Sequence, residues 1–312
     1  MTDILIMGEL LVEIMRNEVE GQLYEAGIFH GPYASGAPAI CAGAAARLGS
    51  SVTLVGGVGE DDFGKCILNK LKTCGVDVSN VQVTRQVSTG VAFNLSFRDG
   101  SRKFIYHMGN SAAVIARTPE SDVFSGLKIM HIMGCSLACK KKFAEEILRT
   151  MHSAYAHGAK ISFDPNIRTE LFTDESFNET IEDVLQHTSI FLPGKNELLL
   201  TLKEKSVEKA IEKCFTYPNM EMVMLKNGAK GSILYRRGEE PMRFDAYKIK
   251  EIDATGAGDC FDGAFLSAIS QNESLETAGK WAAAAGALNA EAFGPMEGKI
   301  SMENIVRVIG NC

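Results

Sequence analysis

The sequence has little of what marks fibrous, repeat or multi-domain chains. Its 312 residues include only 8 prolines and 1 tryptophan. No internal repeat, low-complexity tract or proline- and serine-rich linker interrupts the chain, so nothing supports a division into sequential domains. We therefore expect a single folded domain over residues 1–312. A chain of this length can bury a core that needs no disulfide or metal to hold it together.

Long apolar runs and an excess of positive charge are also missing. The alanine-rich stretch 282–288 is much shorter than the ~18 apolar residues of a membrane span. The apolar start of the chain is interrupted by Asp3, Glu9 and Glu13 and lacks the basic residues of a signal peptide. With 32 Lys and Arg against 39 Asp and Glu, the net charge is −7. We therefore expect neither a nucleic acid nor an anionic membrane as a partner.

The cysteines lack the paired spacing of a disulfide framework. The eight of them lie mostly in apolar segments, at Cys41, Cys66, Cys74, Cys135, Cys139, Cys214, Cys260 and Cys312. Such cysteines in a chain of this size indicate reduced thiols, which predicts a cytoplasmic location. The Gly-x-x-x-x-Gly-Lys-[Ser/Thr] motif is absent as well, so phosphate binding by a Walker-type lysine loop is excluded.

What the sequence does contain is an alternation of β-type and α-type segments. The β-type runs lie at 4–7, 52–55, 127–133, 159–163, 188–192, 221–226 and 232–236. Helical spacing of apolar residues marks 38–48, 63–71, 142–156 and 206–215. This alternation predicts an α/β fold with a doubly wound, mostly parallel sheet covered by helices on both faces.

Two segments, 13–34 and 81–108, break the alternation. Both lack helical periodicity, and the second reads as a β-hairpin around Asp99 and Gly100. We expect them to form a small β-sheet that projects from the main domain as a lid. Its outer surface would carry the apolar side chains of Leu23, Ile28, Phe104 and Tyr106. Exposed apolar side chains need a partner, so we expect a homodimer joined through the lids.

The strongest chemical signal is the stretch Asp253-Ala-Thr-Gly-Ala-Gly-Asp259. Apolar residues at helical spacing follow it, so a helix begins near Gly256. The small residues 256–258 then place backbone amides at a helix N-terminus, where an anion binds, with Asp259 in the first turn. This pattern suits phosphoryl transfer, with the amides on the phosphoryl group and Asp259 accepting a hydroxyl proton. The alternative is a plain loop-to-helix turn in which Asp259 favours the helix dipole.

The same stretch resembles the second signature of the ribokinase/PfkB-type carbohydrate kinases. Other motifs of that family follow in order, at Ser35-Gly-Ala-Pro-Ala39, Gly57-Val-Gly59, Asp164-Pro-Asn166-Ile-Arg168 and Lys226-Asn-Gly228-Ala-Lys-Gly231. The segments GELLVEIM, SGAPAI and FGPMEG look most like the branch with 2-keto-3-deoxygluconate kinases and tagatose-type sugar kinases. The resemblance covers nearly the whole chain, and it implies the ribokinase-like α/β fold with a small β-sheet lid.

The resemblance also implies site residues. Asp259 would be the catalytic base, and Gly256, Ala257 and Gly258 would form the anion hole. The phosphate acceptor would face Glu13, Gly36, Ala37 and Arg168. ATP would be bordered by Lys226, Gly228 and Gly231. Glu197 would support Mg²⁺ through water, and Asp253 and Thr255 would lie near a site for a monovalent cation such as K⁺.

The implied activity is transfer of the γ-phosphoryl group of ATP to a hydroxyl of a small sugar or sugar acid. Relatives often carry Asn where this chain has Ile40, and 2-keto-3-deoxygluconate kinases tend to carry Arg where it has Met108. Both differences favour a neutral hexose, a ketose phosphorylated at a primary hydroxyl. Arg102 and Lys103 on the predicted hairpin remain as basic residues for a carboxylated substrate. Two alternatives stay open: a nucleoside kinase of the same fold, and a non-catalytic sugar-binding sensor.

Overall fold

The structure is a computed structural model that describes residues 2–19, 21–98, 101–167 and 177–310. The main sheet consists of β1 (Ile4–Met7), β4 (Val52–Gly59), β5 (Val81–Thr84), β8 (Ile129–Met133), β9 (Lys160–Asp164), β10 (Thr188–Phe191), β11 (Met222–Lys226), β12 (Ser232–Arg236) and β13 (Met242–Phe244). In the described part of the chain these nine strands have the order β13-β12-β11-β10-β9-β8-β1-β4-β5. Strands that are adjacent in the sheet, such as β1 and β8, can therefore be far apart in the sequence.

The main sheet is parallel from β5 to β11, and β12 and β13 run antiparallel at one edge. The strands β1, β8 and β10 are buried along their whole length. Continuous burial is expected of parallel strands that are covered on both faces. The carboxyl ends of the parallel strands share one edge of the sheet, which is where α/β proteins bind their ligands.

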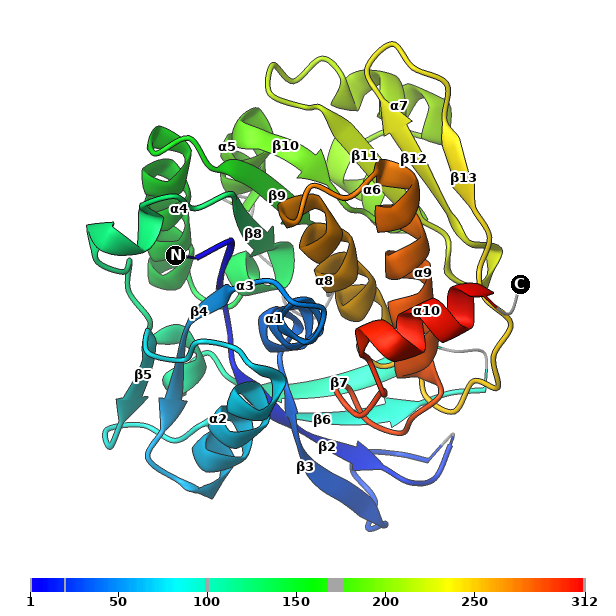
Figure 1. The fold of residues 1–312 in the computed structure, drawn as a ribbon. Coiled ribbons are helices and arrows are strands. Elements are labelled where there is room, and N and C mark those ends of the chain that lie inside the picture. The colour runs from blue at the N-terminus through cyan, green and yellow to red at the C-terminus, as the bar shows by residue number, and fades with distance from the viewer. Residues whose placement is uncertain (1, 20, 99–100, 168–176, 311–312) are drawn as a thin grey trace.

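Helices cover both faces of the main sheet (Figure 1). One face carries α1 (Ala37–Arg47), α2 (Asp62–Cys74), α8 (Ala257–Ser270), α9 (Leu275–Ala290) and α10 (Met302–Gly310). The other carries α3 (Gly134–Ala138), α4 (Lys141–Ala156), α5 (Phe177–His187), α6 (Lys195–Leu202) and α7 (Val207–Cys214). Each group buries its own hydrophobic core against the sheet. The predicted doubly wound α/β fold is confirmed.

A second sheet of four strands lies below the main sheet in Figure 1. Its strands are β2 (Leu11–Arg16), β3 (Phe29–Ser35), β6 (Gly90–Ser96) and β7 (Arg102–His107), in the order β3-β2-β6-β7. We call it the lid sheet. β6 and β7 pair antiparallel from Val91 with His107 to Ser96 with Arg102. The turn predicted at Asp99 and Gly100 lies outside the described residues.

The lid sheet differs from the predicted segments 13–34 and 81–108 in one respect. Val81–Thr84 is not part of it, because this short strand pairs parallel with β4 as the edge of the main sheet. β4 runs on to Gly59, past the register of β1, which ends opposite Val55. Its last residues therefore have free backbone groups that β5 satisfies.

The lid strand β7 alternates in exposure along its length. Arg102, Phe104 and Tyr106 face inward, while Lys103 and Ile105 are exposed. The expectation that Phe104 and Tyr106 lie on the outer surface of the lid is therefore wrong, since side chains alternate between the faces of a strand. Within the described ranges, no helix is both long enough and apolar enough to span a membrane.

Candidate active site

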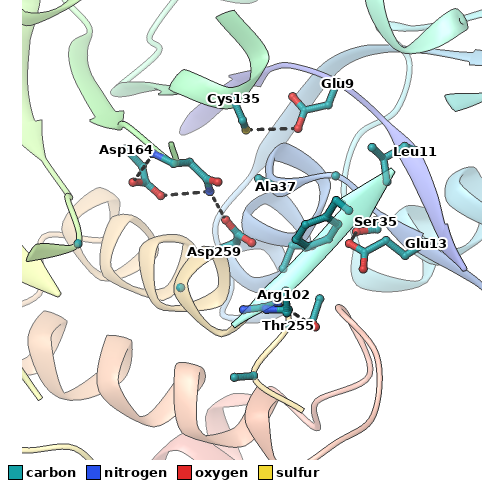
Figure 2. A pocket seen from close by; sticks show the side chains of 18 of the residues that line it. Glu9, Leu11, Glu13, Ser35, Ala37, Arg102, Cys135, Asp164, Thr255 and Asp259 are labelled. Atoms are coloured by element: carbon teal, nitrogen blue, oxygen red, sulfur yellow. Dashed lines mark hydrogen bonds between the residues drawn. The ribbon is translucent and has the colours of Figure 1, made fainter. Parts of the chain in front are cut away.

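A pocket of about 320 Å³ lies between the carboxyl ends of the main sheet and the lid sheet (Figure 2). On the main-sheet side it is lined by Glu9, Gly36, Ala37, Ile40, Cys135, Asp164, Asn166, Gly194, Glu197, Lys226, Gly228, Ala254, Thr255, Gly256, Gly258 and Asp259. The lid side contributes Leu11, Glu13, Ser35, Arg102, Phe104, Tyr106 and Met108. Most residues that the sequence predicts for the site therefore converge on one cavity.

The turn 254–258 enters α8 through a backbone conformation that favours glycine. Gly256 is the N-cap of α8 with φ of 77°, and a Cβ there would lie 2.4 Å from the carbonyl oxygen of Pro295. Gly258 lines the pocket, and a Cβ on it would meet no other atom within 4 Å. The first amides of a helix have no partner within the helix. The turn therefore presents N–H groups and the positive end of a helix dipole to the cavity.

Asp259 lies in the first turn of α8 and is only 6% exposed. Its Oδ1 accepts a hydrogen bond of 2.8 Å from Nδ2 of Asn166, which follows β9. Asn166 has a positive φ of 38°, and its backbone N–H donates to Oδ1 of Asp164 at 3.1 Å. Oδ1 of Asn166 is buried and has no partner among the described residues. The amide thus fixes the orientation of a carboxylate that can accept a proton.

Behind this pair lies a buried charge cluster of three side chains. Nζ of Lys226 lies 3.0 Å from Oδ2 of Asp164 and 2.8 Å from Oδ2 of Asp262. Burial alone lowers the pKa of Lys226, but the two carboxylates outweigh it and the net pKa is raised. Burial raises the pKa of Asp262 well above its usual range, whereas Lys226 lowers that of Asp164 against its own burial. Lys226 thus lies between two buried acidic side chains, and its positive charge offsets part of the cost of burying them.

On the lid side, Glu13 is buried in β2 and accepts hydrogen bonds from Oγ of Ser35 at 2.6 Å and Nδ2 of Asn94 at 2.5 Å. Burial raises its pKa, although these donors and the nearby Arg102 oppose the shift. Arg102 extends across the pocket and donates from Nη1 to Oγ1 of Thr255 at 2.9 Å. Figure 2 shows this contact between the lid sheet and the turn that precedes α8.

The remaining predicted residues take different places. Glu197 lines the pocket, and its carboxylate accepts backbone N–H groups of Ile167 at 3.0 Å and Gly194 at 2.7 Å. Gly231 does not line the pocket; it turns the chain at φ of 82°. Ala257 and Asp253 do not line it either. Arg168, predicted to face the acceptor, lies outside the described residues.

Asp253 and Thr255, which are predicted to lie near a monovalent cation, are hydrogen-bonded to each other. Oδ1 of Asp253 accepts the backbone N–H of Thr255 at 3.0 Å and its hydroxyl at 2.7 Å. Oδ2 accepts the backbone N–H of Gly294 at 3.0 Å. The guanidinium of Arg102 thus already places a positive charge beside this pair.

Sequence reasoning missed four polar residues of this region as site residues: Glu9, Asp164, Asn166 and Asp262. Glu9 accepts hydrogen bonds from Cys135 and Ser136 at the pocket wall. Asn166 and Asp164 could have been found, because they follow the β-type run that ends at 163 and precede Arg168. Asp262 had no such signal, since its position on the apolar α8 shows only once the helix is packed.

Comparisons with known proteins cover nearly the whole chain. The model of the pfkB family carbohydrate kinases matches residues 1–301. Fructokinase-1 of Oryza sativa is 32% identical over 297 residues, which is 91% of this chain and 90% of that protein. Fructokinase-2 of Solanum lycopersicum is 28% identical over 276 residues, with 87% and 83% covered.

Solved structures agree with these relatives. An E. coli protein described as "putative Ribokinase II", 32% identical, superposes with a TM-score of 0.94 over 100% of both chains. A second structure of it, in complex with ATP and Mg²⁺, has a TM-score of 0.93 over the same coverage. Fructokinase from Xylella fastidiosa with bound ATP is 25% identical and has a TM-score of 0.86, with 99% and 98% covered.

Proposed function

Because this chain belongs to the pfkB family of carbohydrate kinases, enzymes that phosphorylate a sugar hydroxyl, we propose that it transfers the γ-phosphoryl group of ATP to a neutral ketohexose. The relatives named fructokinases support a ketohexose as the acceptor. The E. coli relative solved with ATP and Mg²⁺ supports these two as donor and metal.

The acidity of the acceptor end of the pocket carries the proposal for a neutral sugar. Glu9 and Glu13 line this end, and Met108 lines it where a carboxylated substrate would need a cation. Arg102 is the cation that the lid sheet contributes, and Thr255 already engages it. A buried carboxylate on the substrate would lack a full partner and would be costly. Hydroxyl groups, by contrast, donate well to carboxylate oxygens.

The phosphoryl transfer follows from the geometry of the base and the turn before α8. Asp259 accepts the proton of the acceptor hydroxyl while that oxygen forms a bond to the γ-phosphorus, and the bond to the β,γ-bridging oxygen breaks so that ADP leaves. Asn166 holds the carboxylate of Asp259 in position. The first amides of α8 stabilise the charge on the phosphoryl group, and the lid sheet keeps water from competing with the sugar.

Mg²⁺ would bind near Glu197. An ionised carboxylate accepts about four hydrogen bonds, so Glu197 can hold metal-bound water as well as the two backbone N–H groups. When bound, Mg²⁺ neutralises phosphate charge during transfer. We also propose that K⁺ bound near Asp253 and Thr255 activates the enzyme. Replacing K⁺ by tetramethylammonium in the assay tests this activation.

The decisive experiment measures ADP release by the purified protein with a panel of acceptors. Fructose and tagatose represent neutral ketohexoses; ribose, 2-keto-3-deoxygluconate and adenosine represent the alternatives. We expect kcat/KM to be highest for a ketohexose and ³¹P NMR to show a primary phosphate ester. A preference for 2-keto-3-deoxygluconate or adenosine would overturn the proposed substrate class. No ADP release with any sugar would favour the sensor.

A homodimer through the lid sheets and a cytoplasmic location complete the proposal. Tyr24 and Ile28, which precede β3, are 81% and 61% exposed and offer apolar surface next to the lid sheet. The seven cysteines within the described residues are all free thiols, in keeping with a reducing compartment. Light scattering is expected to give twice the chain mass of 33.8 kDa and about half that value for Tyr24→Asp with Ile28→Asp. A wild-type monomer would contradict the dimer.

A further inference from the structure

A cluster of possible metal ligands lies on the helices α4 and α5, away from the pocket. It consists of His152 on α4 and of Asp183 and His187 on α5. Nε2 of His152 lies 2.9 Å from Oδ2 of Asp183, and Nδ1 of His187 lies 3.3 Å from Oδ1 of the same carboxylate. One ligand atom from each residue lies within 4.8 Å of those of the other two. Two imidazoles and a carboxylate thus converge from two helices.

The neighbouring structure fixes these side chains in place. Asp183 and His187 are one helical turn apart and share a face of α5. Nδ1 of His187 donates to the backbone carbonyl of Asp183 at 2.8 Å, so the neutral ring keeps a lone pair on Nε2. The ring of Tyr155 packs edge-on against His187 at 4.9 Å, and its hydroxyl donates to Oδ1 of Asn219 at 3.2 Å. Metal-binding histidines are typically held in this way through their other nitrogen.

We propose that His152, Asp183 and His187 bind Zn²⁺, with water completing the coordination. Zn²⁺ binds imidazole nitrogen and carboxylate oxygen at about 2.0–2.2 Å in tetrahedral geometry, which places neighbouring donors roughly 3.4 Å apart. Nε2 of His152 and Oδ2 of Asp183, at 2.9 Å, are close to this spacing, and one ligand atom of each of the three residues lies within 4.8 Å of those of the other two. Mg²⁺ and Ca²⁺ prefer oxygen ligands, so this site is distinct from that of the Mg²⁺ used with ATP.

The place of the cluster indicates what the metal does. α4 leads into the amino end of β9, and His187 is the last residue of α5 before β10 begins. The cluster therefore lies at the edge of the main sheet opposite the carboxyl ends that line the pocket. Its side chains are 51%, 33% and 24% exposed for His152, Asp183 and His187, so an ion can enter from solvent. Zn²⁺ bound here joins α4 to α5 and stabilises the fold without taking part in phosphoryl transfer.

The test is a calorimetric titration of the metal-free full-length protein with ZnCl₂, followed by thermal unfolding with and without the metal. We expect one strong site per chain and a Tm that rises by roughly 5 °C when free Zn²⁺ is about 100 times its Kd. His187→Ala and Asp183→Asn should each weaken binding at least ~10-fold and remove the rise in Tm. His157→Ala is the matched control, because this nearby exposed histidine is not in the cluster, and it should bind Zn²⁺ as the wild type does.

Co²⁺ distinguishes this site from the free thiols. The spectrum of the Co²⁺ complex should lack the intense near-ultraviolet charge-transfer band of a thiolate ligand and should disappear in His187→Ala. The variants lie on the surface, and their apo Tm values show whether they fold. Zn²⁺ binding that persists in both variants, a thiolate band, or no binding to the wild type would overturn the proposal. The ADP-release activity is expected to be the same in all of these variants, so the outcome is independent of the kinase assay.

Discussion

The two walls of the pocket are built in different ways. On the main-sheet side, Asp259, Asn166 and Asp164 form a continuous chain of hydrogen bonds that ends at Lys226 and the fully buried Asp262. On the lid side, strand β7 alternates between half-buried and exposed positions, and its Arg102 makes a polar link to the opposite wall. The main-sheet wall carries the residues proposed for phosphoryl transfer, the step that all acceptors share. The lid wall carries residues proposed to contact the sugar, which differs between acceptors.

Breaking the buried charge cluster of the main-sheet wall should give the largest loss of stability. Lys226→Met leaves the carboxylate of Asp164 buried without its cation, and breaking a buried pair in this way costs about 3–5 kcal/mol of unfolding free energy. Urea unfolding of the metal-free protein measures this loss. Lys65→Met is the matched control, because the pair of Lys65 with Asp62 is exposed and should contribute less than ~1 kcal/mol. Equal losses in the two variants would contradict the role of the cluster.

The next effect concerns the base itself. Asp259→Asn keeps the shape of the side chain but cannot accept a proton, so kcat should fall at least ~100-fold. ATP binding measured by calorimetry should change little, because the amides of α8 remain. Asp62→Asn, an exposed residue in the first turn of α2, serves as the control and should keep full activity. Near-normal turnover in Asp259→Asn would remove this carboxylate from the mechanism.

Asn166 should show a smaller effect with a distinct signature. Asn166→Ala removes the N–H group that stabilises the ionised Asp259, and a hydrogen bond to a charged group of this kind accounts for roughly a 10-fold change. Because the lost donor favoured the charged form, the pKa of the base rises and the acidic limb of the kcat/KM profile moves to higher pH. A purely structural role would lower kcat without moving this limb. The pH profile therefore decides between the two.

The sequence predicted the main-sheet wall of the pocket better than the lid wall. The strand ends and the glycine turn before α8 carry local signals, because β-type runs, helical spacing and glycine positions depend on neighbours in the chain. Asp262 carries no such signal, because its role depends on its contact with Lys226, which lies 36 residues earlier in the sequence. Phe104 and Tyr106 were assigned to the wrong face of the lid because alternation gives two faces without telling which one is buried.

The edge strand β5 is the other element that the sequence places wrongly. Its residues are predicted as part of the lid, but they pair with the free backbone groups of β4 in the main sheet. Four residues with two exposed positions carry too weak a pattern to show which sheet they join, and pairing between distant strands depends on the packed structure. Helix α6 also has only a weak amphipathic pattern of its own, so its burial depends on the sheet that it covers.

The smallest expected effect is that of removing the side chain of Arg102. Arg102→Ala removes the contact from the lid to Thr255 and leaves the base, Asn166 and the turn before α8 unchanged. Because Arg102 links the lid sheet to the turn before α8, its loss should raise KM for the proposed sugar about 5-fold, within the range of a charged hydrogen bond that is partly replaced by water, while kcat changes less than 2-fold (about 0.4 kcal/mol). Lys103→Ala, the exposed neighbour on β7, should change neither value. If Arg102→Ala instead lowers kcat as strongly as Asp259→Asn, the guanidinium acts on the transferring phosphoryl group, and the division between a catalytic main-sheet wall and a sugar-binding lid wall does not hold.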